Sequence, residues 1–91
     1  MPRNPDGTIR LTLAERFWPK VAMPEYGCWT WTGYVDEFGY GRINKGGRVS
    51  SVLMAHRVSW ELSHGLVPEN LCVLHYCDNP PCVRPSHLFL G

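Results

Sequence analysis

Hydrophobic positions along the chain follow two spacings, and these predict which segments are helices and which are strands. In residues 54–64, apolar side chains recur three or four positions apart, as on one face of an amphipathic helix. Gly65 comes directly after this segment, at a position where glycine commonly ends a helix. Residues 54–64 are therefore the clearest helix that the sequence predicts. The apolar positions of its face are Met54, Ala55, Val58 and Leu62.

A shorter helix is predicted near the N-terminus, over residues 13–18. Thr12 and Glu15 form a capping-box pattern, in which the Thr hydroxyl accepts a backbone N–H and the Glu side chain reaches back. Phe17 and Trp18 are the side chains of this helix that we expect to contact the core.

Alternating segments rich in aromatic and β-branched residues predict strands elsewhere. In residues 27–33, Trp29 and Trp31 share one face, and Cys28 points to the other. The first three predicted strands are expected to form one small antiparallel sheet, with a tight turn at residues 44–47. The last two are expected to pair with each other. The predicted strands are 27–33, 40–43, 48–53, 71–75 and 87–90.

The length of 91 residues suits one small α+β domain. We expect residues 1–10 to form a flexible N-terminal arm and residues 11–91 to form the domain. A chain of this size buries a limited core, so a metal or a disulfide would help it fold. The net charge of +1 excludes a strong overall attraction to nucleic acid, so any basic surface must come from local clustering.

Two further features concern the setting in which the protein works. The chain has no apolar run of about 18 residues, so no membrane span is expected. Its N-terminus lacks the apolar core of a signal peptide. We therefore expect a cytoplasmic, reducing setting, where clustered cysteines bind metal more often than they form disulfides.

Residues 74–88 gather most of the candidate chemistry of the chain. Cys77, Cys82 and His87 follow one another as C-x4-C-x4-H on a turn-rich loop, a spacing that indicates a zinc site. The alternatives are two disulfides, or buried free thiols with His87 capping a turn. Because a tetrahedral zinc site needs four ligands, either Cys28 or Cys72 must complete it.

We favour Cys28 as the fourth ligand. It points away from the two tryptophans of its strand and follows a glycine, where close approach is easy. Cys72 instead shares a strand face with Leu74. A ligand at Cys28 would tie the N-terminal half of the chain to the loop and remove much entropy from the unfolded state.

His75 lies just outside the ligand triplet. Its imidazole can take a proton near neutral pH, as a general base needs, or it can simply donate to a backbone carbonyl in the core. Basic residues on the predicted helix and hairpin are candidates for contacts with a nucleic-acid backbone. On the hairpin such residues are commonly only a solvated surface, and His56 and Arg57 on the helix could instead simply pair with nearby acids or carbonyls, which the sequence alone favours. These candidates are Arg42, Lys45, Arg48, His56 and Arg57.

Four motifs, taken together in order and spacing, resemble the zinc-containing HNH endonucleases, many of them phage-encoded or homing enzymes. The resemblance covers roughly residues 10–91. The motifs are Gly27-Cys28-Trp29-Thr30-Trp31-Thr32-Gly33, Gly39-Tyr40-Gly41-Arg42, Ala55-His56-Arg57-Val58-Ser59-Trp60-Glu61-Leu62 and His75-x-Cys77-Asp78-Asn79-Pro80-x-Cys82-Val83-x-Pro85-x-His87-Leu88.

The resemblance implies a ββα-metal core, in which two strands flank a zinc-bound loop and a helix follows. It implies that His75 is the general base that activates water against a phosphodiester of DNA. It also implies that structural zinc is held by Cys28, Cys77, Cys82 and His87. A catalytic Mg²⁺ or Mn²⁺ is expected in addition, to stabilise charge on the phosphate.

The sequence departs from the family pattern in three places. Leu74 stands where many relatives have a metal-binding Asp before the catalytic His. The chain ends at Gly91, so we expect the final helix, with its last metal ligand, to be absent. Arg84 stands where relatives often have Asn, and it would add a phosphate contact.

These departures keep two other functional classes open. One is a catalytically inactive, zinc-stabilised DNA-binding module, and the other is a purely structural protein–protein module. A homodimer is one arrangement in which a small nuclease would pair two active sites.

Overall fold

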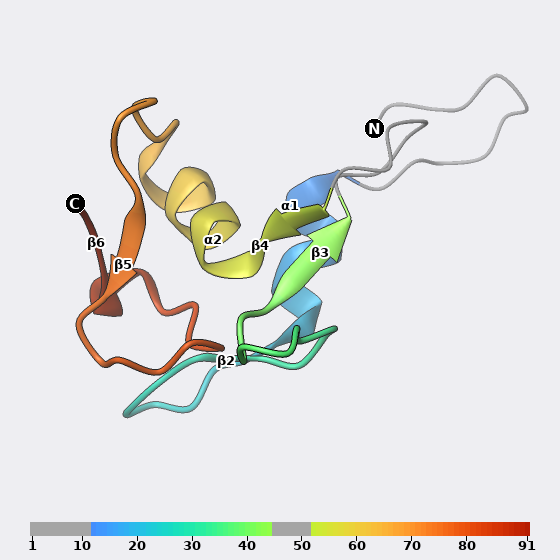
Figure 1. The fold of residues 1–91 in the computed structure, drawn as a ribbon. Coiled ribbons are helices and arrows are strands. Elements are labelled where there is room, and N and C mark those ends of the chain that lie inside the picture. The colour runs from blue at the N-terminus through green and yellow to red at the C-terminus, as the bar shows by residue number, and fades with distance from the viewer. Residues whose placement is uncertain (1–11, 45–51) are drawn as a thin grey trace, which may run out of the picture.

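The computed structural model of the chain describes residues 12–44 and 52–91 (Figure 1). The predicted arm at residues 1–10 lies outside the described residues. So does most of the predicted turn and strand at residues 45–51, with the candidates Lys45 and Arg48.

The predicted N-terminal helix is confirmed as α1 (Leu13–Phe17), which continues into a 3-10 helix, η1 (Trp18–Lys20). The capping box is formed, because the Glu15 N–H donates to Thr12 Oγ1 at 3.2 Å and the Thr12 N–H donates to Glu15 Oε1 at 3.0 Å. Phe17 is fully buried, and its ring stacks on Trp31 with centroids 4.9 Å apart. The short helix thus begins at a side-chain cap and ends on the core.

The strands form three separate antiparallel pairs, so the prediction of one three-stranded sheet is wrong. Segment 27–33 does not pair with the next predicted strand, because its backbone hydrogen bonds are made with residues 21–22 and with residues 81–83. Trp31 N–H donates to Pro81 O, and Val83 N–H donates to Trp29 O, so this segment is bonded to a loop far along the chain. The pairs are β1 (Val21–Ala22) with β2 (Thr30–Trp31), β3 (Arg42–Asn44) with β4 (Val52–Met54), and β5 (Val73–His75) with β6 (Leu88–Leu90).

Helix α2 (Ala55–His64) confirms the predicted main helix, but its buried face differs from the predicted one. Ala55 and Val58 are buried, whereas Leu62 is 39% exposed. Two polar residues, His56 and Ser59, are buried instead. They fit because each bonds to a backbone carbonyl: His56 Nε2 to Val73 O at 3.0 Å, and Ser59 Oγ to Val83 O. Apolar periodicity alone did not predict polar side chains that tie the helix to the loop and strand beside it.

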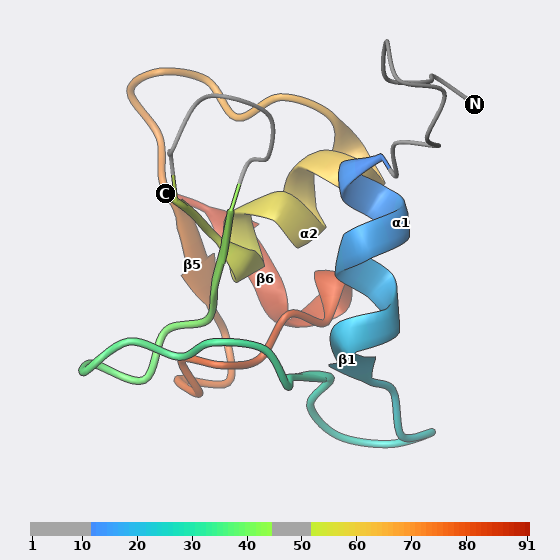
Figure 2. The same cartoon turned by 90° about the vertical axis from the view of Figure 1, so that its right-hand side faces the viewer.

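Helix α2 lies at the centre of the fold, between the β5–β6 hairpin and the group formed by α1, β3 and β4 (Figures 1 and 2). It separates two apolar clusters. The larger contains Phe17, Trp31, Ile43, Ala55, Val58 and Val83, and the smaller contains Val67, Val73 and Leu88. Among the described residues, no helix is long and apolar enough to cross a membrane.

The α+β fold class is confirmed by the two helices, the antiparallel strand pairs and a group of cysteine and histidine side chains beside them. The β5–β6 hairpin and its connecting loop supply the two strands and the loop of the expected ββα-metal core. Residues 76–87, which we call the Cys–His loop, connect the two strands.

Candidate metal centre and histidine pocket

The Cys–His loop is held closed by its own backbone. Tyr76 N–H donates to His87 O at 2.8 Å and continues the β5–β6 ladder past the end of the strands. Inside the loop, Cys82 N–H donates to Asn79 O at 2.9 Å. A single turn of 3-10 helix, η2 (Pro85–His87), then brings the imidazole back toward the cysteines.

Cys28 reaches the loop from the other half of the chain. Gly27, with a φ of +85°, turns the backbone just before it, in a conformation that glycine adopts readily. The residues that follow are bonded to the loop by the backbone bridge between Thr30 and Cys82. Arg84 adds a side-chain contact, because its Nη1 donates to Gly27 O at 2.7 Å while its guanidinium lies over the Trp29 ring.

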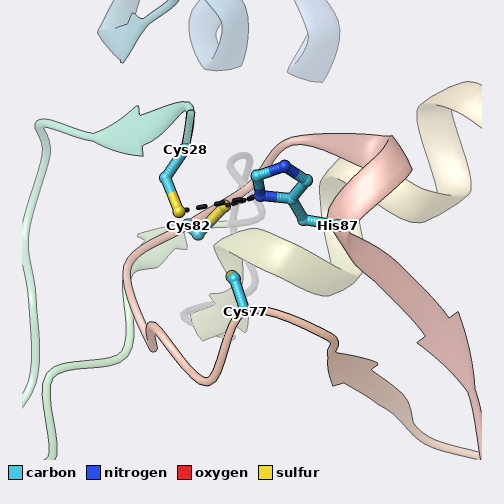
Figure 3. A group of neighbouring side chains, drawn as sticks. All are labelled: Cys28, Cys77, Cys82 and His87. Atoms are coloured by element: carbon cyan, nitrogen blue, oxygen red, sulfur yellow. Dashed lines mark hydrogen bonds between the residues drawn. The ribbon is translucent and has the colours of Figure 1, made fainter. Parts of the chain in front are cut away.

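The structure brings all four predicted zinc ligands together (Figure 3). Their ligand atoms all lie within 4.8 Å of one another. His87 Nδ1 lies 3.6 Å from Cys28 Sγ and 3.5 Å from Cys82 Sγ. Zinc bonds of about 2.3 Å to sulfur and about 2.05 Å to nitrogen, at a tetrahedral angle, would put these atoms about 3.6 Å apart. Cys28, Cys77, Cys82 and His87 therefore fit a tetrahedral zinc ion.

The choice of Cys28 over Cys72 agrees with this geometry. Cys72 is exposed, and its backbone pairs with Gly91 at the far end of the β5–β6 hairpin. All four thiols of the chain are free, so the alternative with two disulfides is not what the structure shows.

Two thiols of the cluster have pKa values shifted in opposite directions. Burial raises the pKa of the Cys82 thiol to about 12. A hydrogen bond with the Asn79 side chain lowers the pKa of Cys28, which is closer to the surface. A bound divalent ion stabilises thiolates directly and would offset the cost of burying Cys82 in its charged form.

His75 lies at the end of β5, half-buried and next to the loop. Its Nε2 is 2.8 Å from the Cys82 carbonyl oxygen. Because a carbonyl only accepts, Nε2 must carry the proton, and Nδ1 is then left with its lone pair. The hydrogen bond to a backbone carbonyl that we expect of a core histidine is thus present. It also leaves the His75 ring with one nitrogen, Nδ1, that can accept a proton.

A pocket of about 580 Å³ opens beside His75. Most of its wall is apolar, from Met54, Val73, Leu74, Pro80 and Phe89, and its polar lining residues are Tyr40, His56, His75 and Asp78. A mostly apolar pocket with a few convergent polar groups is the usual form of a binding or active site.

His56, which the sequence offered either as a DNA contact or as a partner of a nearby acid or carbonyl, also lines this pocket. It is 5% exposed, and its ring centroid lies 4.7 Å from that of His75. Its Nδ1 is buried and has no hydrogen-bond partner within residues 12–44 and 52–91. Burial, with a smaller contribution from His75, lowers the pKa of His56 to about 4, so the ring is neutral at neutral pH. Its bond to Val73 O confirms the expected alternative of pairing with a nearby carbonyl, whereas the packing of α2 against β5 that forms the pocket leaves no local signal in the sequence.

Asp78 is the carboxylate that the sequence analysis did not single out as a site residue. It is the acidic residue among the pocket-lining side chains, and its φ of +52° turns it away from the usual backbone region. Leu74, which stands where relatives have an acid, is 41% exposed at the same pocket. The signal in the sequence was the position of Asp78, three residues after His75. Within residues 12–44 and 52–91, the zinc-type cluster is the one group of three or more potential metal ligands.

The described DNA-contact candidates all have intramolecular partners. Arg42 forms a 2.8 Å ion pair with Asp36, and Arg57 forms a 3.2 Å pair with Glu61 one helical turn away. Arg84 is engaged by the Gly27 carbonyl. A guanidinium has five N–H donors, so these contacts leave donors that can still reach a phosphate.

Residues 53–91 match the family model described as HNH endonuclease. Protein 2.8 of Escherichia phage T7 is 36% identical over 84 residues, which cover 89% of this chain and 54% of that protein. Protein 7.7 of the same phage is 42% identical over 64 residues, covering 70% of this chain and 47% of that protein. The chain thus spans about half the length of these relatives.

No solved structure matches the chain. The family match begins in β4 and includes all of α2, the histidine pocket's two imidazoles and three of the four candidate zinc ligands. Cys28 lies outside the matched residues, and the fold brings it to them. Residues 53–91 thus carry the sequence pattern of the HNH endonuclease family, as the resemblance implied.

Proposed function

We propose that the chain is an HNH-type DNA endonuclease domain that hydrolyses a phosphodiester with His75 as general base. One observation carries this proposal. The Nε2 proton of His75 is committed to the Cys82 carbonyl, so the basic Nδ1 remains available beside an open pocket. The match of residues 53–91 to the HNH endonuclease family supports the proposal.

Structural zinc would be held by Cys28, Cys77, Cys82 and His87. Four protein ligands leave no open position on the ion, so its role is to fix the loop and not to activate water. The backbone carbonyl that orients His75 belongs to Cys82, one of these ligands. Zinc would therefore set the position of the general base through one residue.

In the proposed reaction, His75 Nδ1 takes a proton from a water molecule as that water attacks the phosphorus. The bond from phosphorus to the leaving oxygen then breaks, and that oxygen takes a proton from solvent to become a hydroxyl. His75 releases the proton it took from the attacking water to solvent. The Cys82 carbonyl keeps the ring in the Nε2-protonated tautomer before the proton arrives. General-base catalysis of this kind contributes typically about 10²–10⁴ in rate.

A divalent ion, Mg²⁺ or Mn²⁺, would supply charge stabilisation at the phosphate when bound. Such ions prefer oxygen ligands and commonly use one or two carboxylates together with water and substrate phosphate. Leu74 has no ligand atom, and Asp78 is the carboxylate that lines the pocket. The described residues thus fit a site completed largely by water and DNA.

DNA would reach the pocket along the surface that carries the arginine candidates. The unused donors of Arg42, Arg57 and Arg84 suit phosphate oxygens. Lys45 and Arg48, outside the described residues, remain candidates from the sequence. His56 is too deeply buried to serve as a surface contact, and its place in the pocket suggests a different role.

A catalytically inactive zinc-stabilised DNA-binding module is the alternative. Leu74 in place of a carboxylate favours it, as does the single ligand cluster of the described residues. In either case the site needs reduced thiols, so we propose that the protein acts in the cytoplasm of a cell. A homodimer would bring two His75 sites to one duplex, and sedimentation velocity with and without DNA measures this.

Supercoiled plasmid incubated with zinc-loaded protein and Mg²⁺ or Mn²⁺ tests the proposal. We expect metal-dependent nicking that His75→Ala abolishes. His64→Ala is the matched control, because His64 is exposed at the end of α2 and contacts Trp60 away from the pocket. Equal DNA retention without nicking by the wild type would establish the binding module instead. Nicking that persists in His75→Ala would contradict the role of His75.

A further inference from the structure

We infer that His56 is a positioning residue for His75, whose ring it holds in place by direct contact. The inference rests on the proposed function for what His75 does, whereas the contact between the two rings is independent of it. Three features carry the argument: the anchor of His56, its packing against His75 and its neutral state.

The anchor of His56 joins α2 to the strand that carries His75. His56 Nε2 lies 3.0 Å from Val73 O, and Val73 is two residues before His75 on β5. Since the carbonyl only accepts, Nε2 of His56 carries the proton. Both histidines therefore donate from Nε2 to backbone carbonyls, and the direction of each ring is fixed at one end.

The packing supplies the second constraint on His75. A hydrogen bond from Nε2 to Cys82 O fixes one end of the His75 ring but leaves the ring free to turn about that bond. The His56 ring lies 4.7 Å from it, inclined by 39°. Tyr40 contacts both rings, with centroid distances of 5.6 Å to His56 and 6.1 Å to His75. The three rings come from different parts of the chain, and together they restrict the plane of His75.

The state of His56 suits such a support. The ring is 5% exposed and neutral, and the groups that act on it electrostatically are His75, Arg42 and Arg57. A buried neutral ring adds no charge beside His75, and its Nδ1 has no hydrogen-bond partner among the described residues. A histidine needed only to tie α2 to β5 would need its Nε2 and no ring contact with His75.

Two substitutions separate the ring contact from the anchor. His56→Gln keeps an N–H donor near the position of Nε2 and removes the ring. His56→Phe keeps a flat ring and removes the donor. If the ring positions His75, the Gln variant loses more activity than the Phe variant, and if only the anchor matters, the order is reversed.

The experiment measures the kinetics of plasmid nicking and the side-chain NMR signals of ¹⁵N-histidine-labelled, zinc-loaded protein. For His56→Gln we expect kcat to fall about tenfold with KM nearly unchanged, because a misplaced catalytic group slows the chemical step and leaves substrate binding intact. We also expect shifted and broadened ring signals of His75. For His56→Phe we expect kcat closer to the wild type, a lower Tm and His75 signals of an Nε2-protonated ring. Wild-type kcat and unshifted His75 signals in His56→Gln would overturn the inference, as would equal losses in both variants.

The NMR measurement keeps the inference separate from the proposed function. If the wild type cuts no DNA, the proposed function fails, while the His75 signals still test the ring contact in all three proteins. If His56→Gln does not fold, the comparison of His56→Phe with the wild type decides. Retained His75 signals then support the inference, and signals of a freely turning ring overturn it.

Discussion

His75 donates its Nε2 proton to the backbone carbonyl of Cys82 at 2.8 Å, so the candidate base is bonded to a residue of the candidate metal centre. The Cys82 thiol lies 3.5 Å from His87 Nδ1, and both belong to the Cys–His loop. Any ion that fixes this loop therefore also fixes the carbonyl that orients His75. Cys82 thus connects the candidate metal centre, through its thiol, to the candidate base, through its carbonyl.

Removal of zinc is expected to unfold the domain. The cluster links Cys28 to ligands that begin at Cys77, and metal binding to such a small domain is itself folding free energy. We expect one zinc per chain by metal analysis, and a large fall in Tm after chelation or in Cys28→Ser. Cys72→Ser is the control, because Cys72 is exposed and outside the cluster, and it should keep both zinc and Tm. Zinc retained in Cys28→Ser but lost in Cys72→Ser would reassign the fourth ligand.

Arg84 is expected to stabilise the fold as well as any complex with DNA. Its Nη1 donates to Gly27 O at 2.7 Å, and its guanidinium lies 5.2 Å from the Trp29 ring centroid. Loss of a charged hydrogen bond and a cation–π contact costs about 1–2 kcal/mol, so Arg84→Ala should lower the free energy of unfolding by this amount.

Urea unfolding of the zinc-loaded protein measures the effect of Arg84→Ala. The control is Arg57→Ala, which breaks an exposed i,i+4 pair with Glu61 and should cost about 0.5 kcal/mol or less. If Arg84→Ala is no more destabilising than the control, the contact with Gly27 contributes nothing, and Arg84 remains only a DNA-contact candidate.

The helices and the β5–β6 hairpin were predictable because their signals are local. The capping box of α1, the apolar spacing and final glycine of α2, and the alternation of the last two strands all lie within a few residues. The single sheet was not predictable, because segment 27–33 pairs with β1 and with the Cys–His loop about fifty residues away. Backbone pairing between distant segments leaves no periodic trace in either of them.

The metal centre was predictable because ligand chemistry restricts residue types. Three ligands lie within one short loop, and Cys28 was selected from two candidates by strand alternation. The pocket beside His75 was less predictable from the sequence. His56 and Asp78 belong to it through the packing of α2 on β5 and through the backbone turn at Asp78, neither of which a linear pattern encodes.

Acid is expected to destabilise the protein through His56. Burial lowers its pKa from 6.5 to about 4 in the folded state. Between these values the unfolded chain binds a proton that the folded chain does not, so stability falls as the pH falls. The loss begins below about pH 6.5, is complete below about pH 4 and is on the order of 3 kcal/mol. Above pH 6.5 this contribution is constant.

Other groups titrate in the same window, so the pH test needs a difference measurement. Unfolding free energies of the wild type and of His56→Phe, both zinc-loaded, are compared from pH 7 to the lowest pH at which zinc stays bound. Titratable groups common to both proteins contribute to both pH dependences, whereas the His56 contribution affects only the wild type. We expect the difference between the two proteins to shift in favour of His56→Phe as the pH falls. A difference independent of pH would show that His56 is not held neutral by burial.

Asp78 is expected to support the binding of the catalytic divalent ion. It is the carboxylate of the pocket, at a backbone φ of +52° that Asn also tolerates well. Asp78→Asn therefore removes the charge without straining the backbone, and loss of a carboxylate ligand should weaken Mn²⁺ binding. We expect at least about a tenfold rise in the Mn²⁺ concentration needed for half-maximal nicking, which corresponds to about 1.4 kcal/mol.

Direct titration of Mn²⁺ by electron paramagnetic resonance, in the presence of DNA, reports binding without reliance on cleavage. Glu69→Gln, at an exposed turn outside the pocket, is the charge-matched control and should leave both measurements unchanged. If Asp78→Asn binds Mn²⁺ as the wild type does, the ion is held by other oxygens, from DNA or water, and Asp78 has no part in the site.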